Sequence, residues 1–441
     1  MPQIVAYRLN SHAMTDLTSS NPASLTTTLV FALALTLSLM LKFWLASRQI
    51  RHVAQSRGNV PAAFSQKVAL SAHQKAADYT ITKARFGMIE LAWGAVIAVC
   101  WTLLGGLSAL NQLLVGWMGH GLHQQVALLA AFFLIGGVLD LPFTLYQTFV
   151  IEERFGFNKT SLTLWLQDFV KSLLLSALIG LPFITLVIWM MGATGPWWWL
   201  WVWSVWMGFN LLAMLIYPTW IAPLFNKFQP LEDPQVRDRV TQLMARCGFT
   251  SKGFFVMDGS KRSAHANAYF TGFGASKRVV FYDTLLAQLS PAEVDAVLAH
   301  ELGHFSHKHV IKRMVSLFAL SLLGFFALGW VGQQAWFYTG LGVVPNLGAA
   351  NDALALLLFM MVLPLLGSFV GPLFAQMSRK HEFEADAYAV AQTSGKDLAA
   401  ALLKLFEDNA ATLTPDPVYV RFYYSHPPAT ERLGRILGTA H

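Results

Sequence analysis

Two histidines and one glutamate in the segment His300–His304 have the residue types and spacing of a zinc site. His300 and His304 are four residues apart, so on a helix both imidazoles lie on one face and can bind the same ion. A catalytic zinc also keeps one position open for water. Glu301 stands beside the first histidine, where it can take a proton from that water. The motif therefore predicts one Zn2+ per chain, with His300 and His304 as ligands and Glu301 as the general base of a hydrolysis.

The third zinc ligand is expected from a charged segment further along the chain, Ser378–Asp386. Glu382 and Asp386 are again four residues apart. One carboxylate can complete the zinc site, while the other, one helical turn away, hydrogen-bonds a ligand imidazole and fixes its tautomer. His381 and Glu384 are rival ligands by composition. Both point to other faces of the helix if Glu382 points inward.

The histidine motif lies in a helix whose start is clearly marked. Ser290 is a good N-cap, Pro291 fits the first helical position, and Glu293 completes a capping box. A helix that begins here runs through the whole motif. His307 and His309 lie beyond it and fall off the metal-facing position, so we expect them to be solvated or at an interface.

The surrounding segment, 218–310, is expected to mix helix and strand. Asp233 and Pro234 begin an earlier helix as N-cap and first-turn proline, and Gly248 ends it. Runs rich in Phe, Val and Tyr follow and predict a small sheet. The predicted strands lie near 253–258, 267–273 and 278–283. The run 266–274 is expected to be an exposed edge strand, to which an extended peptide can add by backbone pairing.

Composition places the remainder of the chain in a membrane. Hydrophobic residues make up 55% of the 441 residues and charged residues only 12%, roughly half the charged share of soluble proteins. Seven apolar runs approach the roughly 20 residues that a helix needs to cross a bilayer. The predicted spans lie near 26–46, 88–110, 126–149, 170–191, 197–217, 311–333 and 353–375. The polar stretch 1–25 has no periodicity and is expected to be loose.

Loop charges predict the orientation of these spans. The loop 47–87 carries seven Lys and Arg residues, whereas the loops near 111–125 and 334–352 carry none. Because cytoplasmic loops are enriched in Lys and Arg, we expect the first loop inside and the other two outside. Seven spans then place 218–310 and 376–441, which carry the predicted zinc site, on the cytoplasmic side. This distribution also accounts for the net charge of +7 without a nucleic-acid partner.

Several longer blocks of sequence resemble the integral-membrane CAAX prenyl proteases, which are seven-span zinc endopeptidases. The similarity covers nearly everything after the first span. The matching blocks are LPFTLYQTFVIEERFGFNK at 141–159, YPTWIAPLFNKFQPLED at 217–233, ANAYFTGFGASKRVVFYDTLL at 266–286, AVLAHELGHFSHKH at 296–309, SRKHEFEADAYA at 378–389 and SHPPATERL at 425–433.

The resemblance implies roles for individual residues. Glu382 is implied as the third zinc ligand and Asp386 as the carboxylate that orients a ligand imidazole. His426 and Asn267 are implied to face the substrate, with His426 and Asp386 joining the general base in catalysis. Arg432 is implied to support the site.

His426, and the carboxylates of Glu90 and Asp140, each allow a second interpretation. A donor such as His426 beside the metal would stabilise the developing oxyanion by about 3–4 kcal/mol, but the side chain can also simply pack against Pro427 and Pro428. Glu90 and Asp140 lie in or near apolar runs. They either line a water-filled cavity, such as the intramembrane chamber that the resemblance implies, or lie at the membrane interface or pair with a neighbouring helix.

The expected fold is mainly α. It is a multi-pass membrane protein with about seven transmembrane helices and a small α+β zinc-protease domain formed by the 218–310 loop and the C-terminal tail. The expected divisions are 1–217 with spans 1–5, 218–310 with the histidine motif, 311–375 with spans 6–7, and 376–441 with the third zinc ligand.

The resemblance implies a zinc-dependent endopeptidase that cleaves near the C-terminus of CAAX-type, prenylated or other membrane-associated substrates. A rival hypothesis is a quality-control protease that degrades misfolded membrane proteins, as in the related heat-shock metalloproteases, although those chains have fewer spans. A channel or scaffold with a structural metal is a third, but such a site has no use for Glu301. The expected partners are a peptide or protein substrate, with or without a lipid, and membrane lipids, in a bacterial inner membrane or one of endoplasmic-reticulum type. The oligomeric state stays open.

Overall fold

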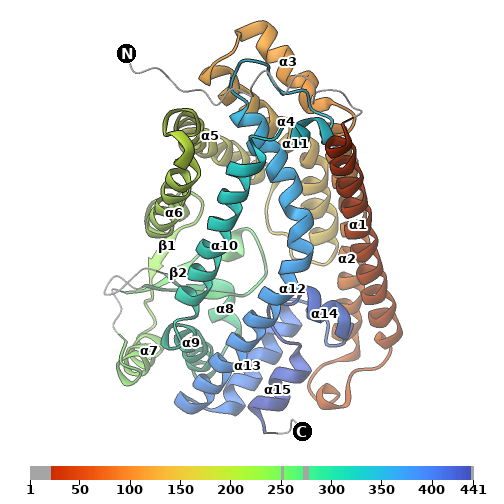
Figure 1. The fold of residues 1–441 in the computed structure, drawn as a ribbon. Coiled ribbons are helices and arrows are strands. Elements are labelled where there is room, and N and C mark those ends of the chain that lie inside the picture. The colour runs from red at the N-terminus through yellow and green to blue at the C-terminus, as the bar shows by residue number, and fades with distance from the viewer. Residues whose placement is uncertain (1–20, 250–252, 272–277, 439–441) are drawn as a thin grey trace.

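Long helices run the height of the molecule, and a small sheet lies beside their lower ends (Figure 1). The computed structural model describes residues 21–249, 253–271 and 278–438, so most of the stretch expected to be loose lies outside the described residues. The helices are α1 (Pro22–Ser56), α2 (Leu70–Trp101), α3 (Gly106–Met118), α4 (Leu122–Tyr146), α5 (Leu162–Ala193), α6 (Trp198–Ile216), α7 (Pro234–Arg246), α8 (Asp283–Gln288), α9 (Pro291–Ser306), α10 (His309–Val331), α11 (Ala335–Gly340), α12 (Asp352–Gln392), α13 (Gly395–Asp408), α14 (Pro417–Tyr423) and α15 (Ala429–Ile436).

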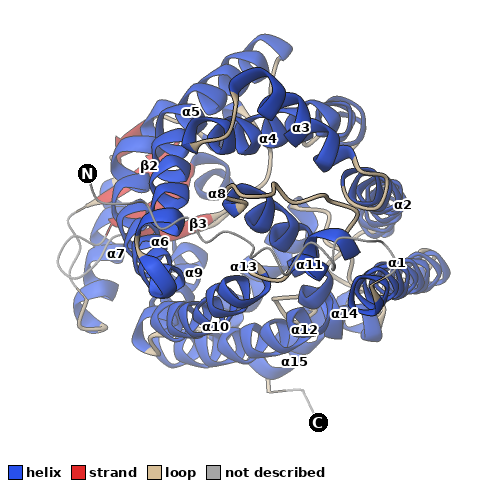
Figure 2. Ribbon diagram, turned by 45° about the horizontal axis from the view of Figure 1, so that its top comes forward, coloured by secondary structure: helices blue, strands red, loops and turns tan. Residues whose placement is uncertain are grey.

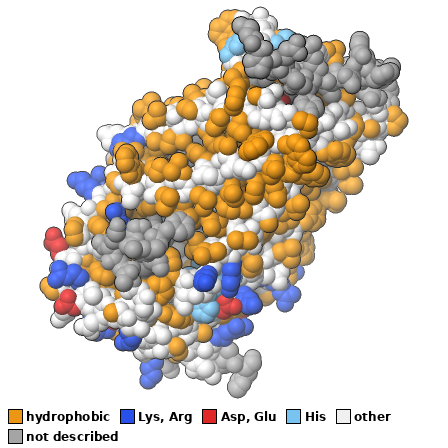
Figure 3. Space-filling view, turned by 60° about the vertical axis from the view of Figure 1, so that its left-hand side comes forward, with side chains coloured by type: hydrophobic (Ala, Val, Ile, Leu, Met, Phe, Trp, Pro, Cys, Tyr) orange, Lys and Arg blue, Asp and Glu red, His pale blue; other side chains and the backbone are white. Residues whose placement is uncertain are grey.

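Seven helices within the described ranges are long and apolar enough to cross a bilayer, which confirms the predicted fold class. They are α1, α2, α4 with the π-helical turn Gln147–Glu152 that extends it, α5, α6 with its flanking turns, α10 and α12. Figure 3 shows their apolar side chains as a broad exposed surface, with charged side chains gathered toward its lower end. An apolar surface of this extent requires contact with lipid. The chain is therefore a multi-pass integral membrane protein.

The predicted limits of the second span are wrong, because an apolar run continues through a break in the helix. The sequence predicts one span over 88–110, but α2 ends at Trp101 and α3 begins after a turn. Gly105 in that turn has a left-handed φ of 75°, and a Cβ on Gly106 would lie 2.6 Å from the carbonyl oxygen of Cys100. Only glycine fits both positions. Hydropathy reports burial in lipid, not helix continuity.

The last long helix, α12, joins the membrane to the predicted zinc site. It is 41 residues long, and it continues past the predicted end of the seventh span at 375 to Gln392. The stretch 376–392 contains neither Gly nor Pro, so nothing in it ends the helix. Glu382 and Asp386 are therefore carried by the same element that crosses the bilayer, and the predicted division at 375 falls inside it.

The small sheet has the strand order β1-β2-β4-β3 among the described residues. Its strands are β1 (Phe228–Pro230), β2 (Phe254–Met257), β3 (Ala268–Thr271) and β4 (Arg278–Tyr282). β2 and β4 are parallel, and the two outer pairs are antiparallel. Three strands lie where they are predicted, whereas β1 is too short to give a period-2 signal. β3 lies at the edge of the sheet, as expected; residues 272–274 of the predicted edge run are outside the described residues.

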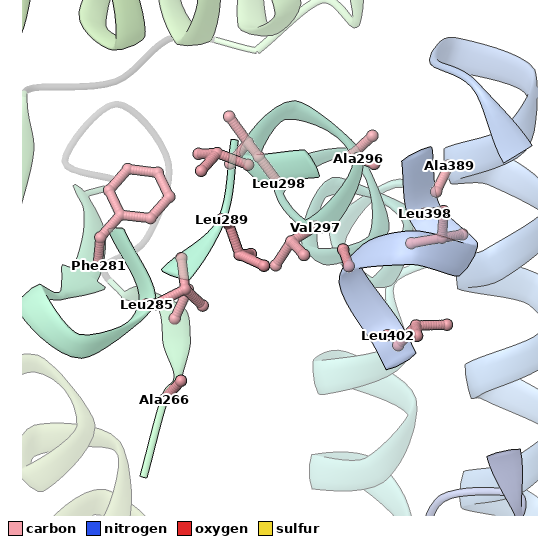
Figure 4. Close-up of a cluster of buried hydrophobic side chains, with 14 of the residues drawn as sticks. Ala266, Phe281, Leu285, Leu289, Ala296, Val297, Leu298, Ala389, Leu398 and Leu402 are labelled. Carbon is pink, nitrogen blue, oxygen red and sulfur yellow. The ribbon is translucent and has the colours of Figure 1, made fainter. Parts of the chain in front are cut away.

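One hydrophobic core holds the sheet, α9 and α13 together (Figure 4). Phe281 of β4 and Leu285 of α8 lie on one side of Leu298 and Val297 of α9, and Leu402 of α13 lies on the other. These side chains are almost fully removed from solvent, and burying each stabilises the fold by about 1.5–3 kcal/mol. The helix that carries the histidine motif is thus anchored by apolar contacts over the turns that precede the motif.

The membrane helices form a ring around the interior of the bundle (Figure 2). A cavity of about 760 Å³ lies among α1, α2, α4 and α12. A second, of about 790 Å³, lies between α1 and α2 and the C-terminal segment 406–428. The two adjoin, because Lys42, Gly87 and Leu91 line both. Glu90 and Asp140 line the first cavity. Of the two interpretations given for these carboxylates, the structure therefore supports the first, that they line a cavity.

Asp416 fastens the C-terminal tail to α1. Its carboxylate accepts hydrogen bonds of 3.2 and 2.9 Å from Arg48. The same side chain caps α14 by accepting from the amides of Val418 and Tyr419. Because α14 leads directly to His426, this contact sets the height at which that histidine lies beside the membrane helices.

Replacing this aspartate should loosen the tail. We expect Asp416→Ala to lower the free energy of unfolding by about 2 kcal/mol, because it removes a helix cap and leaves Arg48 without its partner. Thermal denaturation of the purified protein in detergent measures the effect. The control is Arg57→Ala, which breaks a pair with Asp78 whose side chains are both 43% exposed and should cost less than about 1 kcal/mol. Equal losses in the two variants would contradict the prediction.

Candidate metal centre

Three side chains from α9 and α12 converge on one point. Nε2 of His300 and Nε2 of His304 are 3.3 Å apart. Glu382 faces both, with one carboxylate oxygen 3.4 Å from His300 Nε2 and the other 3.4 Å from His304 Nε2. The structure therefore brings together the two histidines of the motif and the carboxylate that the resemblance implies as the third ligand.

The spacing and chemistry of this group fit a zinc ion. Two ligand atoms of a tetrahedral zinc at 2.0–2.1 Å are separated by about 3.3–3.4 Å. The two histidine nitrogens have this separation, and each lies at a similar distance from one oxygen of Glu382. Glu382 Oε2 is buried without a hydrogen-bond partner among the described residues, a costly state that a cation would relieve. Burial opposes a charge on His300, but the neighbouring carboxylates of Asp386 and Glu382 raise the pKa of its imidazole to about 9. The position thus strongly favours positive charge.

The capping box expected at the start of α9 is present. Ser290 Oγ accepts from the amide of Glu293, whose carboxylate accepts from the Ser290 amide at 2.7 Å. Glu293 also accepts a hydrogen bond of 2.7 Å from Lys404 of α13. These bonds fix where the helix starts, and therefore which face carries the two histidines.

The glycine inside the motif sets the distance between α9 and α12. A Cβ on Gly303 would lie 2.8 Å from Cα of Ala385 and 3.1 Å from its carbonyl oxygen. Any larger residue would push the helices apart. Gly303 and Ala385 thus bring Glu382, on α12, within reach of the histidines on α9.

Asp386 and Arg432 support the first histidine. Asp386 lies one turn after Glu382 and places Oδ1 2.9 Å from His300 Nδ1. Arg432, from α15, donates two hydrogen bonds of 2.8 and 2.6 Å to the same carboxylate. Burial opposes the charge of the guanidinium, but the hydrogen bonds to Asp386 raise its pKa. A carboxylate held in this way fixes the imidazole with Nε2 free for a metal.

Glu301 lies beside the metal-binding face. Among the described residues, the structure records no hydrogen bond to its carboxylate. Burial raises the pKa of its carboxyl above the usual range, although the neighbouring His300 and His304 oppose the shift. A carboxylate with a raised pKa accepts a proton more readily and returns it more slowly to water. Its surroundings suit the predicted general base.

His426 approaches the centre from the C-terminal tail. Its Nε2 is 3.4 Å from Glu382 Oε1, and its side chain is 65% exposed. His426 also lines the second of the two bundle cavities, together with Pro427 and Pro428. The side chain therefore faces the space next to the metal ligands and does more than pack against the prolines.

Asn267 is the predicted site residue that the structure does not join to this group. It lies just before the edge strand β3 and is exposed. Its side-chain oxygen accepts a hydrogen bond from the next amide, that of Ala268, at 2.8 Å. A role toward substrate would come from its place at the end of the strand, not from contact with the metal ligands.

His309 corrects one expectation. It is 4% exposed, not solvated, and its Nδ1 is 3.0 Å from Nδ1 of His304. The two rival ligands, His381 and Glu384, lie beside His309 and form a separate group with it. Helical spacing could not reveal this, because α9 ends before His309 and a new helix begins there.

Comparisons with protein families match nearly the whole chain. Residues 49–227 match the family described as CAAX prenyl protease N-terminal, five membrane helices, and residues 230–440 match peptidase family M48. The boundary between the two matches falls just before α7, where the chain leaves the membrane helices for the sheet and the metal centre.

Individual relatives agree with these matches. The CAAX prenyl protease 1 homolog of Arabidopsis thaliana is 36% identical over 354 residues, which cover 80% of each chain. CAAX prenyl protease 1 of Saccharomyces cerevisiae is 37% identical over 70% of this chain and 71% of its own. The crystal structure of Ste24p from S. mikatae superposes with a TM-score of 0.87 at 30% identity, covering 93% of this chain and 99% of that one.

The close approach at Gly303 can be tested directly. We expect Gly303→Ala to weaken zinc binding about tenfold, because the added methyl meets Ala385 and moves the histidines away from Glu382. Competition with a chromophoric zinc chelator measures the affinity. The control is Gly324→Ala on α10, where an added Cβ meets no atom within 4 Å. Wild-type zinc affinity in Gly303→Ala would contradict the prediction.

Proposed function

Because the chain belongs to peptidase family M48 and, within it, to the CAAX prenyl proteases, we propose that it binds one zinc ion through His300, His304 and Glu382. Membership in this family makes the chain a membrane metalloendopeptidase. The proposal rests on one observation above all. The Nε2 atoms of the two histidines lie 3.3 Å apart, and each lies 3.4 Å from one of the two carboxylate oxygens of Glu382. His426, 3.4 Å from the same carboxylate, lines a cavity that reaches the membrane helices α1 and α2.

The proposed reaction is hydrolysis of a peptide bond with Glu301 as the general base. A zinc ion held by the three ligands would polarise the scissile carbonyl and lower the pKa of a water molecule. Glu301 takes the proton from the attacking water and then passes it to the leaving amine. The raised pKa of its carboxyl favours this shuttle, because a stronger base takes up the proton more readily.

The remaining site residues orient and stabilise. Asp386, fixed by Arg432, holds the tautomer of His300. His426 is placed to donate a hydrogen bond to the substrate carbonyl oxygen as negative charge develops there, a contribution of about 3–4 kcal/mol in comparable sites. Asn267 stands at the start of the edge strand β3, where an extended substrate could pair with the backbone and be held at one end.

We propose that the substrate is a peptide close to the membrane, with CAAX-type proteins as the preferred class. Relatives at 36–37% identity carry the name CAAX prenyl protease. The cavity beside His426 is bordered by Lys42 and Leu91 of the membrane helices, so a peptide at the metal can keep an attached lipid within the bilayer. The match to the CAAX-specific N-terminal region disfavours the quality-control hypothesis.

We place the metal centre on the cytoplasmic side. The loop between α1 and α2 lies at the same end of the bundle as α9 and α13 (Figure 1). That loop and its flanks carry the concentration of Lys and Arg, whereas the turns at the opposite end carry none. The positive-inside rule then assigns the sides.

The substrate class and the base can be tested together. We expect zinc-dependent cleavage of a farnesylated peptide that ends in a CAAX sequence. Its kcat/KM should be well above that for an unfolded membrane protein. Glu301→Gln should retain zinc but cleave about 100- to 10,000-fold more slowly, because it loses the proton acceptor. Mass spectrometry of products and metal analysis supply the two readouts.

The control for that experiment is Glu232→Gln, an exposed acidic residue between β1 and α7, which should cleave like the wild type. Normal cleavage by Glu301→Gln would refute the assignment of the base. Faster cleavage of the unfolded protein than of the CAAX peptide would favour quality control instead.

Sidedness can be tested by labelling single cysteines in a variant without Cys100 and Cys247. We expect Leu347→Cys, on the exposed turn before α12, to react with a membrane-impermeant maleimide in intact cells. Ser65→Cys, in the exposed loop between α1 and α2, should react only after the membrane is opened. The reverse pattern would place the metal centre outside the cytoplasm.

A further inference from the structure

A chain of hydrogen bonds lies behind His304 and is not used by the proposed reaction. His304 Nδ1 is 3.0 Å from Nδ1 of His309, and Nε2 of His309 is 2.8 Å from an oxygen of Glu384. His309 is buried. The ring of His381 stacks on it, with centroids 4.0 Å apart and 11° between the planes. The central imidazole is therefore held both at its edges and across its face.

We propose that His309, backed by Glu384, positions His304 as a zinc ligand. The inference rests on the proposed zinc site. A histidine that binds zinc through Nε2 keeps its remaining proton on Nδ1, so that nitrogen can only donate. His309 Nδ1 must then accept, which places the proton of His309 on Nε2, where it donates to Glu384. Each nitrogen and oxygen in this series of hydrogen bonds then acts either as a donor or as an acceptor. The ring plane and the tautomer of His304 are thereby fixed.

A different reading of the same residues is a second metal site. Donor atoms of His309, His381 and Glu384 all lie within 4.8 Å of one another. Two distances argue against it. The 2.8 Å between His309 Nε2 and Glu384 is that of a direct hydrogen bond, shorter than the roughly 3.3–3.4 Å between two ligands of a tetrahedral zinc. The same ring also spends its other nitrogen on His304. The geometry therefore favours support of the first metal over a second one.

The backbone between α9 and α10 is shaped to bring His309 to this place. Five residues along a continuous helix, a side chain points about 140° away from the starting one. Here α9 ends at Ser306, and Lys308 takes a left-handed φ of 57° before α10 starts at His309. The left-handed position costs about 1–2 kcal/mol for a residue with a Cβ. The turn formed at Lys308 places His309 beside His304, and the contacts made there offset this cost.

The two histidine ligands thus receive different support. His300 donates directly to Asp386, a buried carboxylate held by Arg432. Nδ1 of His304 reaches a carboxylate through a second imidazole, and Glu384 at the far end is 29% exposed. The second arrangement places less negative charge beside the metal, yet it fixes the ligand in the same way.

The test compares substitutions that keep or remove the acceptor. His309→Phe keeps the ring and its stacking on His381 but offers nothing to His304 Nδ1–H. His309→Asn places an amide oxygen near the position of Nδ1. We expect His309→Phe to weaken zinc binding about 10- to 100-fold and His309→Asn to stay within about threefold of wild type. Zinc competition with a chelator gives the affinity, and the visible spectrum of the cobalt(II)-loaded protein reports the ligand geometry.

Two controls separate this role from others. His381→Phe preserves the stacking and has no bond to His304, so zinc affinity and a stoichiometry of one should be unchanged; loss of a second zinc equivalent in this variant would establish the rival metal site and overturn the inference. Thermal denaturation of the metal-free proteins checks the fold. Wild-type zinc affinity in His309→Phe, or an equal loss in His309→Asn with an unchanged melting temperature, would also overturn it.

Failure of the zinc site itself gives a different result. If Glu382→Gln binds zinc as tightly as wild type, the proposed ligand set is wrong whatever the His309 variants do. If Glu382→Gln loses zinc and His309→Phe does not, the ligand set stands and only the supporting role of His309 falls.

Discussion

The contact between Gly303 of α9 and Ala385 of α12 is the constraint on which the metal centre depends. The motif helix belongs to the sheet domain, and Glu382 belongs to a helix that crosses the bilayer. Because Gly303 has no side chain, the backbones of α9 and α12 come close together there. The two carboxylate oxygens of Glu382 can then face the two histidines. A single methyl group at that point would oppose a spacing that zinc requires to within a few tenths of an ångström.

Once the two helices are close, the charges of the site require compensation. Glu382 and Asp386 are both buried, and two adjacent buried carboxylates repel each other and lose hydration. Arg432 answers part of this, with two hydrogen bonds to Asp386 and a distance of 3.7 Å to Glu382. The remaining negative charge is offset by whatever cation the histidines share. The anionic surroundings and the nitrogen ligands therefore favour the same occupant, a divalent metal.

The sequence predicts the local elements of this site better than their connections. The capping box of Ser290 and the four-residue spacing of the histidines follow from helical geometry alone, and both appear in the structure. Hydropathy does not reveal the continuity of α12 through 375, because it falls where the helix leaves lipid. The sequence signal for continuity is a different one, the absence of Gly and Pro from 376–392. The burial of His309 could not be predicted. It depends on one left-handed residue, Lys308, whose identity carries no signal for that conformation.

The continuity of α12 has a consequence for how a membrane-bound peptide can reach the metal. Because one helix carries both the apolar span and Glu382, the distance of this carboxylate from the span is set by the rise of the helix. In the proposed reaction, the peptide comes to this carboxylate through the space that His426 borders, which adjoins the cavity lined by Glu90 and Asp140. Carboxylates inside a ring of membrane helices are tolerated where water or polar substrate groups reach them. If the substrate carries a lipid, as we propose, its polar chain can enter through this space while the attached hydrocarbon stays within the bilayer.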